Sequence, residues 1–296
     1  MQQNKEAITQ WTESAPYWEK HRDMIRDMFT PVTQALIDDA AITEGTRVLD
    51  VAMGPGEPAL SIAERVGSKG KVVGTDLVPA MVEAARREAQ RRGLHNASFE
   101  VGADRLSFPA NSFDAVVCRF GVMFFPSPVD AIREWLRVLK PGGRIAAAVW
   151  HFADRNPFFH VVAGVVERYV PSSPPVPDAP DAFRFATPGK LQAVLSEAGV
   201  AGISERMLRF SIQAPITVED FWTIRSEISE KLRTKIASLS KEQIAELKSE
   251  VIEALREYSS DGGVRLPAEV LIVSGRKEPS SETRHEKNRK KKSTSG

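Results

Sequence analysis

Short apolar runs alternate along this chain with stretches whose apolar residues have helical spacing, beginning at residue 47. Between the runs, apolar positions recur every three or four residues and predict helices, the clearest from Pro79 to Arg92, where Gly93 follows as a stop signal. Such alternation predicts a parallel sheet with helices on both faces, whose ligands bind at the carboxyl ends of the strands. The runs predict strands at 47–51, 71–76, 98–102, 113–119 and 144–150.

The remainder of the chain has a different pattern. A helix is predicted over 188–198, and two further strands are predicted over 203–212 and 266–274. Two long segments interrupt this order, at 151–187 and 217–259. We therefore expect an α/β fold with a doubly wound, mostly parallel seven-stranded sheet, carrying a lid segment and a helical insert.

The two interrupting segments contain apolar anchors. In 151–187, an apolar helical pattern from Phe158 to Tyr169 precedes five prolines between 171 and 180, which is typical of an ordered lid. In 217–259, the pair Phe221 and Trp222 is apolar, and Ser240-x-x-Gln243 is a capping-box pattern. We expect the lid, the insert and an aromatic helix over 11–22 to enclose a mostly apolar acceptor pocket. A dimerisation surface is the alternative role for the insert.

Composition narrows the class of protein. The 296 residues are 42% hydrophobic, enough for a sizeable core, but no apolar run is long enough to span a membrane. The first residues lack the apolar core of a signal peptide, so a cytoplasmic location is expected. The single cysteine, Cys118, excludes an internal disulfide and a multi-cysteine metal site, and we interpret it as a small buried apolar residue.

The net charge of +1 is unevenly distributed. Residues 279–296 contain six Lys or Arg against two Glu and no core-forming apolar residue. Such a segment is typical of a disordered, solvated tail, and contact with nucleic acid is the alternative. The expected organisation is one domain over 1–278, with an N-terminal helical cap over 1–46, followed by this tail.

A glycine-rich loop follows the first strand, and its charges indicate the cofactor. The segment Asp50-Val51-Ala52-Met53-Gly54-Pro55-Gly56-Glu57-Pro58 loosely fits a dinucleotide fingerprint. A pyrophosphate needs backbone N–H donors and no nearby negative charge, but this loop has two acids and two prolines. S-adenosylmethionine has no phosphate and carries a sulfonium and an ammonium group, so the same acids favour it.

Four segments, in order, resemble motifs of the class I S-adenosylmethionine-dependent methyltransferases. The glycine loop is similar to their first motif in the form found in the ubiquinone/menaquinone C-methyltransferase-like group. The other three segments are Gly74-Thr75-Asp76-Leu77-x-x-x-Met81, Phe108-Pro109-x-x-x-Phe113-Asp114 and Leu139-Lys140-Pro141-Gly142-Gly143. The chain departs from the family where Gly102-Ala103 replaces Asp-Ala, with the acid displaced to Asp104, and where Met123-Phe124 replaces the Arg-Asn of the quinone enzymes.

The resemblance implies a set of cofactor-binding residues. In it Asp76 binds both ribose hydroxyls, the backbone of Ala103 reaches the adenine, and the first helix, with Tyr17 and Trp18, covers the methyl donor. The full expected set is Tyr17, Trp18, Asp50, Ala52, Met53, Gly54, Gly56, Asp76, Leu77, Met81, Gly102, Ala103, Asp104 and Arg119. No metal is expected.

In-line methyl transfer needs little protein chemistry beyond orientation, exclusion of water and a base. His151 directly follows the fifth strand, His160 lies in the lid helix and Tyr17 in the first helix, so these three are the candidate catalytic residues. We predict an S-adenosylmethionine-dependent methyltransferase for a small apolar or aromatic acceptor, with a homodimer as a possible assembly. The alternatives are a nicotinamide-dependent oxidoreductase and a non-catalytic protein that binds nucleic acid through its basic tail.

Overall fold

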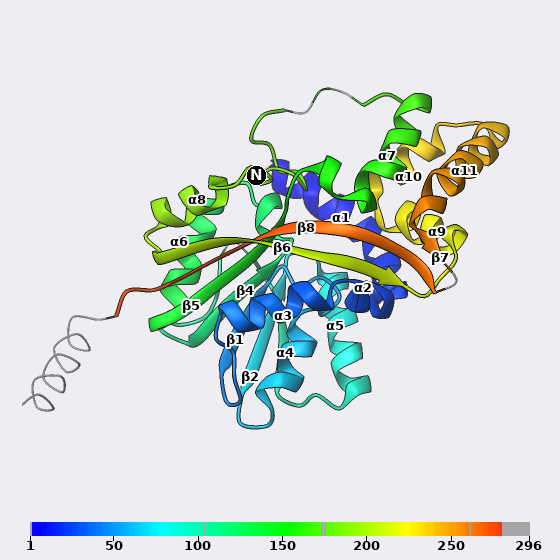
Figure 1. The fold of residues 1–296 in the computed structure, drawn as a ribbon. Coiled ribbons are helices and arrows are strands. Elements are labelled where there is room, and N and C mark those ends of the chain that lie inside the picture. Colours follow the sequence, from blue (N-terminus) through cyan, green and yellow to red (C-terminus); the bar gives the residue numbers. More distant parts are fainter. Residues whose placement is uncertain (1, 104, 173, 175, 261, 280–296) are drawn as a thin grey trace, which may run out of the picture.

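The computed structural model describes residues 2–279 except 104, 173, 175 and 261. The expected basic tail, apart from Pro279, lies outside the described residues. The central feature is one sheet with the strand order β3-β2-β1-β4-β5-β8-β6, and the short β7 pairs with β8 (Figure 1). The strands are β1 (Arg47–Val51), β2 (Lys71–Asp76), β3 (Ala97–Val101), β4 (Phe113–Arg119), β5 (Leu139–Trp150), β6 (Ala201–Ala214), β7 (Ser259–Ser260) and β8 (Gly263–Arg276).

The first five strands are parallel and the remaining pairings are antiparallel. This confirms the doubly wound, mostly parallel α/β fold predicted from the sequence. The central strands are buried on both faces and therefore read as continuous apolar runs, such as Val116-Val117-Cys118 in β4. Cys118 is fully buried, as expected, and burial raises the pKa of its thiol to about 12.

Helices α4 (Ala59–Val66) and α5 (Pro79–Arg92) pack on β1, β2 and β3, and α3 (Thr30–Asp39) packs on β4 and β5. Helix α5 has the predicted bounds because Pro79 occupies its first turn and Gly93 adopts the left-handed conformation at its end. Helices α6 (Pro128–Val138) and α8 (Lys190–Ala198) pack together near β5 and β6. Short 3-10 turns η1 (Val122–Phe124) and η2 (Ala153–Arg155) follow β4 and β5.

The boundary between α6 and β5 differs from the prediction. The sequence predicts a helix to Leu139, a turn over 141–143 and a strand from Arg144. In the structure, β5 begins at Leu139, which pairs with Phe113, and the register shifts before Arg144 pairs with Ala115. The turn is thus an irregularity within the strand, because the ladder resumes on both sides of it.

The helices of the two interrupting segments gather at one end of the molecule. The lid contains α7 (Pro157–Tyr169), and the insert forms α9 (Val218–Ile228), α10 (Glu230–Ala237), α11 (Lys241–Leu255) and η3 (Arg256–Tyr258). These helices lie beyond the ends of β6 and β8 (Figure 1). The capping box at Ser240 and Gln243 is present, and Phe221 and Trp222 are buried, as the sequence predicts.

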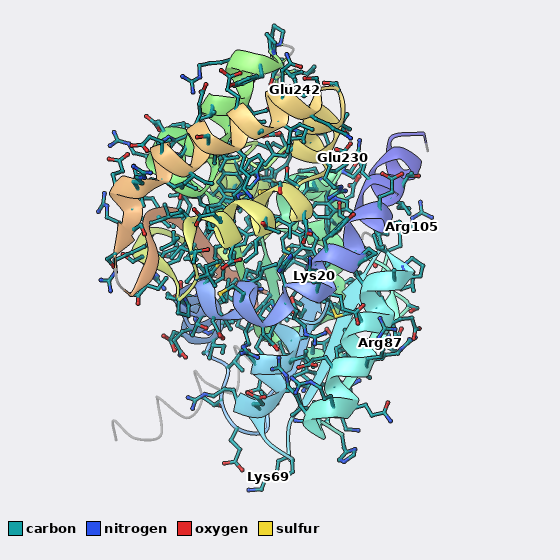
Figure 2. The ribbon with its side chains drawn as sticks, turned by 90° about the vertical axis from the view of Figure 1, so that its right-hand side faces the viewer. Lys20, Lys69, Arg87, Arg105, Glu230 and Glu242 are labelled. Atoms are coloured by element: carbon teal, nitrogen blue, oxygen red, sulfur yellow. The ribbon has the colours of Figure 1, made fainter. Side chains whose placement is uncertain are left out.

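The N-terminal cap consists of α1 (Gln2–Lys20), α2 (Arg22–Met28) and α3. Figure 2 shows α1 between α5 and the helices of the insert, with Lys20 at its end and Arg87 on α5. In the described part of the chain, no helix has both the length and the apolar character needed to cross a bilayer.

Candidate cofactor site

A cavity opens where β1, β2 and β4 end, which is the edge that a parallel sheet predicts for a ligand site. Its wall combines the N-terminal helices with the loops that follow these strands. It is lined by Ile8, Trp11, Trp18, Arg22, Ile25, Arg26, Phe29, Ala52, Met53, Gly54, Pro55, Glu57, Asp76, Leu77, Val78, Met81, Ala103, Arg119, Phe120, Gly121, Phe124 and Phe125.

The glycine loop after β1 is held in left-handed backbone conformations. Ala52 has φ +59°, Gly54 +60° and Gly56 +119°. A Cβ atom built on Gly54 would meet no atom within 4 Å, and this residue lines the cavity. A side chain at Gly54 would therefore project into open cavity space, which glycine keeps free for a ligand.

Asp76, at the end of β2, fixes this loop to its neighbour. One carboxylate oxygen accepts the Gly54 N–H at 2.9 Å, and the other accepts the Val78 N–H, also at 2.9 Å. Burial raises the pKa of this carboxyl, and the same two N–H groups act in the opposite direction. Since each oxygen has a second lone pair and Asp76 lines the cavity, the carboxylate can also accept hydroxyl donors from a ligand.

The two acids of the loop lie in different surroundings. Glu57 lines the cavity, but its carboxylate already accepts hydrogen bonds from Arg92 at 3.1 Å and the Ser61 hydroxyl at 2.6 Å. Asp50 is fully buried and does not line the cavity, and burial raises its pKa well above the usual range against the effect of Arg119. The attraction that the loop acids exert on a cation is thus partly offset by these arginines.

Arg119 ends β4 and brings a cation to the cavity wall. Its Nη1 donates to the Thr33 hydroxyl at 2.9 Å and its Nη2 to the Glu57 carbonyl at 3.3 Å. Burial lowers the pKa of this guanidinium, while the nearby carboxylates of Glu57 and Asp50 raise it. Arg119 therefore sits among acids that compensate its buried charge.

Aromatic rings form the opposite wall of the cavity. The Trp11 ring lies 6.0 Å from that of Trp18 and 5.3 Å from that of Phe124. The Phe29 ring meets that of Phe120 edge-on at 5.5 Å. These rings line the cavity, and aromatic rings suit both a cationic sulfonium and an apolar ligand.

The structure brings nine of the fourteen predicted cofactor-binding residues to the cavity wall. These are Trp18, Ala52, Met53, Gly54, Asp76, Leu77, Met81, Ala103 and Arg119. Tyr17, Asp50, Gly56 and Gly102 do not line it, and Asp104 lies outside the described residues. Gly56 instead shapes the loop, because its carbonyl accepts the Leu60 N–H at 2.8 Å.

The three candidate catalytic residues do not line this cavity either. His151 is buried, and its Nδ1 lies 3.1 Å from Glu269 Oε2. Tyr17 faces the insert, where the Arg233 guanidinium lies 5.0 Å from its ring centre. His160 is half-buried in α7. A catalytic role for these residues stays a prediction.

The lid and the insert contribute no residue to the wall of this cavity, contrary to the expectation that they enclose it directly. The insert packs on α1 instead, and the lid helix α7 packs on the insert. The Trp18 indole N–H donates to the Ile228 carbonyl of α9 at 3.1 Å, and Lys20 pairs with Glu227 at 2.8 Å. The insert thus supports the helix that forms the wall, because the Ile228 carbonyl and the Glu227 carboxylate of α9 both bind side chains of α1.

Several wall residues were not anticipated from the sequence. Arg22, Ile25, Arg26 and Phe29 line the cavity, and their spacing continues that of Trp18 every three or four residues. This periodicity was the available signal, since it marks one face of a helical segment. Phe120 also lines the cavity and has a φ of +61°. A left-handed backbone at a non-glycine residue often marks a functional site, but this signal is visible only in the structure.

Comparison with known proteins identifies the class. A family model described as a methyltransferase domain matches residues 48–143. The demethylmenaquinone methyltransferase of Thermus thermophilus is 33% identical over 179 residues, which cover 57% of this chain and 80% of that protein. The chain belongs to the class I S-adenosylmethionine-dependent methyltransferases, and its cofactor is S-adenosylmethionine.

Two further relatives differ in the share of this chain and of their own chain that the match covers. The aklanonic acid methyltransferase DauC of a Streptomyces species is 44% identical over 121 residues, covering 40% of this chain and 55% of that protein. The match thus spans only about half of that relative. The nocamycin O-methyltransferase of Saccharothrix syringae is 29% identical over 270 residues, covering 87% of this chain and 94% of that protein.

Solved structures are similar in fold. The YcgJ protein of Bacillus subtilis superposes with a TM-score of 0.53 at 22% identity, covering 84% of this chain and 98% of that one. This likeness supports the α/β methyltransferase fold and carries no information on the substrate.

Proposed function

We propose that this protein transfers the methyl group of S-adenosylmethionine to a small aromatic or otherwise apolar molecule. One observation carries the proposal: a single cavity joins the glycine loop and Asp76 on one side to a wall of aromatic rings on the other. The first side fits the cofactor, and the second fits an apolar acceptor.

The residues present suit the cofactor. Gly54 leaves room for its methionine part, and Asp76 has lone pairs for the two ribose hydroxyls. Leu77, Met81 and Ala103 offer apolar contacts for the adenine. When bound, S-adenosylmethionine supplies an electrophilic methyl group together with its own leaving group. Ring faces beside the sulfonium would stabilise it by roughly 0.5–2 kcal/mol.

The chain's own contribution to the reaction is then mainly orientation and exclusion of water. Trp11, Trp18 and Phe124 close the cavity from the side of α1 and η1, which holds an acceptor against the methyl donor. His151, Tyr17 and His160 remain our proposed bases, although each must act from outside the wall of this cavity. For His151, the Glu269 carboxylate lies beside the imidazole, with Oε2 3.1 Å from Nδ1.

The names of the relatives support a small-molecule acceptor. They act on aklanonic acid, nocamycin and demethylmenaquinone, as their names state, and all three are methyltransferases. This favours methyl transfer over the nicotinamide-dependent and nucleic-acid-binding alternatives. A cytoplasmic location is supported by the single cysteine, which offers no internal disulfide. A homodimer stays a prediction.

The test is turnover with labelled cofactor. The purified protein is incubated with S-adenosylmethionine carrying a tritiated methyl group and a panel of phenols, hydroxyquinones and aromatic acids. We expect label in at least one organic product, with equimolar S-adenosylhomocysteine, and no label with the Gly54→Val variant. Reduction of a panel member by NADH without any methyl transfer would contradict the proposal.

A further inference from the structure

Arg22, in α2, is a cation of the cavity wall with unused N–H donors. Its side chain is 13% exposed, and the residue lines the cavity. Its Nη2 donates to Glu88 Oε2 at 2.7 Å, whereas its Nε–H is buried and has no hydrogen-bond acceptor in the described part of the chain. A guanidinium carries five N–H donors, and a buried donor without an acceptor is costly. The protein itself therefore does not satisfy the hydrogen-bonding capacity of this side chain.

The Glu88 carboxylate is shared and does not compensate Arg22 alone. It also accepts from Arg91 at 2.6 and 2.7 Å and from Arg92 at 2.6 Å, so three guanidinium groups surround it. Arg92 has a further carboxylate in Glu57, at 3.1 Å, and Arg91 is 62% exposed to water. For Arg22, Glu88 is the one carboxylate within ion-pair distance among the described residues. A second carboxylate beside Arg22 would therefore be attracted to it.

The other two arginines that line the cavity are already compensated. Arg26 donates to two carboxylates, those of Asp23 and Asp27, at 3.0 and 2.9 Å. Arg119 uses both of its Nη groups within the protein, and the carboxylates around it compensate its charge. Of the three cations on the wall, Arg22 is therefore the one that an anionic ligand would pair with.

The contacts of Arg22 place it between the two sides of the cavity. On one side, its partner Glu88 also binds Arg92, whose Nη1 donates to Glu57 of the glycine loop. On the other side, Trp18 precedes it by four residues and belongs to the aromatic wall. Arg22 can thus reach a group on the cofactor or a group on an acceptor that lies against the rings.

We propose that Arg22 binds a carboxylate inside the cavity, through N–H donors that the protein leaves unused. A carboxylate is the anion that the planar guanidinium fits best. Two molecules can bring one: the methionine part of S-adenosylmethionine, and an acceptor that is itself an aromatic acid. The inference rests on the proposed function for these two sources, but the binding of a carboxylate is measurable without turnover.

The first arm of the test removes the carboxylate from the cofactor product. S-adenosylhomocysteine and its decarboxylated analogue, which keeps the adenosine, the thioether and the amine, are titrated into the protein by calorimetry. If the methionine carboxylate is the ligand, S-adenosylhomocysteine binds the wild type at least tenfold more tightly than the analogue. Arg22→Met then loses at least tenfold in affinity for S-adenosylhomocysteine and less than twofold for the analogue, and Arg22→Lys recovers part of the loss.

The second arm tests an aromatic acid. Anthracene-2-carboxylate and anthracene-2-carboxamide are titrated by fluorescence into the protein saturated with S-adenosylhomocysteine. If the acceptor brings the carboxylate, the acid binds the wild type at least tenfold more tightly than the amide, and Arg22→Met loses this preference. A preference for the carboxylate that depends on Arg22, in either arm, supports the proposal and identifies the source. The absence of such a preference in both arms would overturn it.

Arg91→Met is the matched control. Arg91 binds the same Glu88 carboxylate but does not line the cavity, so this variant disturbs the ion pairs of Glu88 without removing a donor from the cavity. It should bind S-adenosylhomocysteine and the aromatic acid within twofold of the wild type. Equal losses in Arg91→Met and Arg22→Met would show that both act through Glu88 and would refute direct binding of a carboxylate by Arg22.

The two arms also separate this inference from the proposed function. If the wild type binds neither S-adenosylhomocysteine nor its analogue, the proposed function fails, and the second arm is then run without them. A preference for the aromatic acid that depends on Arg22 would in that case keep the carboxylate site. Tight binding of S-adenosylhomocysteine with no effect of Arg22→Met in either arm would keep the proposed function and remove this inference.

Discussion

The two ends of the site are built in different ways. The cofactor end comes from two short stretches of chain, 52–57 and 76–81, which follow adjacent strands. Its key groups are backbone N–H donors and one carboxylate, and its buried cations have acids beside them. The proposed acceptor end is assembled from α1, α2, η1 and their flanking residues, and its key groups are aromatic rings.

This difference explains how many amino-acid substitutions each end of the site can accept. A ligand site made of backbone and one carboxylate accepts few substitutions, because any added side chain occupies ligand space. A site made of side chains on helices far apart in sequence can change its shape and charge without disturbing the sheet. We infer that one end fixes the cofactor and that the other determines which molecule is methylated.

The largest expected effect is at the glycine loop. Gly54→Val should abolish binding of S-adenosylhomocysteine, because the new side chain enters the cavity. Gly93→Val is the matched control, since Gly93 has a similar φ of +68° and open space around its Cβ position but ends α5 away from the cavity wall. Both variants pay roughly 1–2 kcal/mol for left-handed backbone. If calorimetry finds intact binding in Gly54→Val, the cofactor does not bind beside Gly54.

Asp76→Ala comes next. It removes the acceptor for the Gly54 and Val78 N–H groups and the proposed partner of the ribose. Hydrogen bonds to a charged group contribute about 1.5–3 kcal/mol, so the affinity for S-adenosylhomocysteine should fall about 10- to 150-fold. Asp130→Ala, at an exposed position of α6, should bind normally in the same titration. Equal affinity of Asp76→Ala and Asp130→Ala for S-adenosylhomocysteine would show that Asp76 does not bind the cofactor.

Glu88 links the N-terminal cap to the cofactor end and should control acid stability. Hydrogen bonds from Arg91 and Arg92 and the charge of Arg22 lower its pKa from 4.5 to about 2. Its stabilising effect is therefore fully present above pH 4.5 and is lost as the pH falls from 4.5 toward 2. Glu88→Gln should be less stable at pH 7 by about 1.5–3 kcal/mol. Urea unfolding at several pH values should show a flatter acid limb for the variant, and parallel curves would contradict this role.

The smallest expected effect is that of Trp18→Phe, at the contact between α1 and the insert. Trp18→Phe keeps a ring in the cavity wall but loses the hydrogen bond to the Ile228 carbonyl. The free energy of unfolding should fall by about 0.5–1.5 kcal/mol. Affinity for S-adenosylhomocysteine should change little, because a ring remains in the cavity wall. A large loss of that affinity with unchanged stability would show that Trp18 serves only the cofactor.

The same contrast explains what could be predicted from the sequence. The strands that carry the cofactor loops are continuous apolar runs, and Pro79 and Gly93 mark both ends of α5. Asp76 and Gly54 were predicted as site residues because their motif is local. These features depend on residues close together in the sequence, so they can be predicted from it.

The acceptor end could not be predicted in this way. The contacts of Trp18 with Ile228 and of Lys20 with Glu227 join residues more than 200 positions apart. The extent of the insert and its capping box were predicted, but not that it supports α1 from behind.

The most direct test of the central claim is calorimetric titration of the wild-type protein with S-adenosylhomocysteine, followed by NADH. A site built from Gly54, Asp76 and the aromatic wall predicts one bound S-adenosylhomocysteine per chain and no heat from NADH. Binding of NADH that displaces S-adenosylhomocysteine would contradict the account.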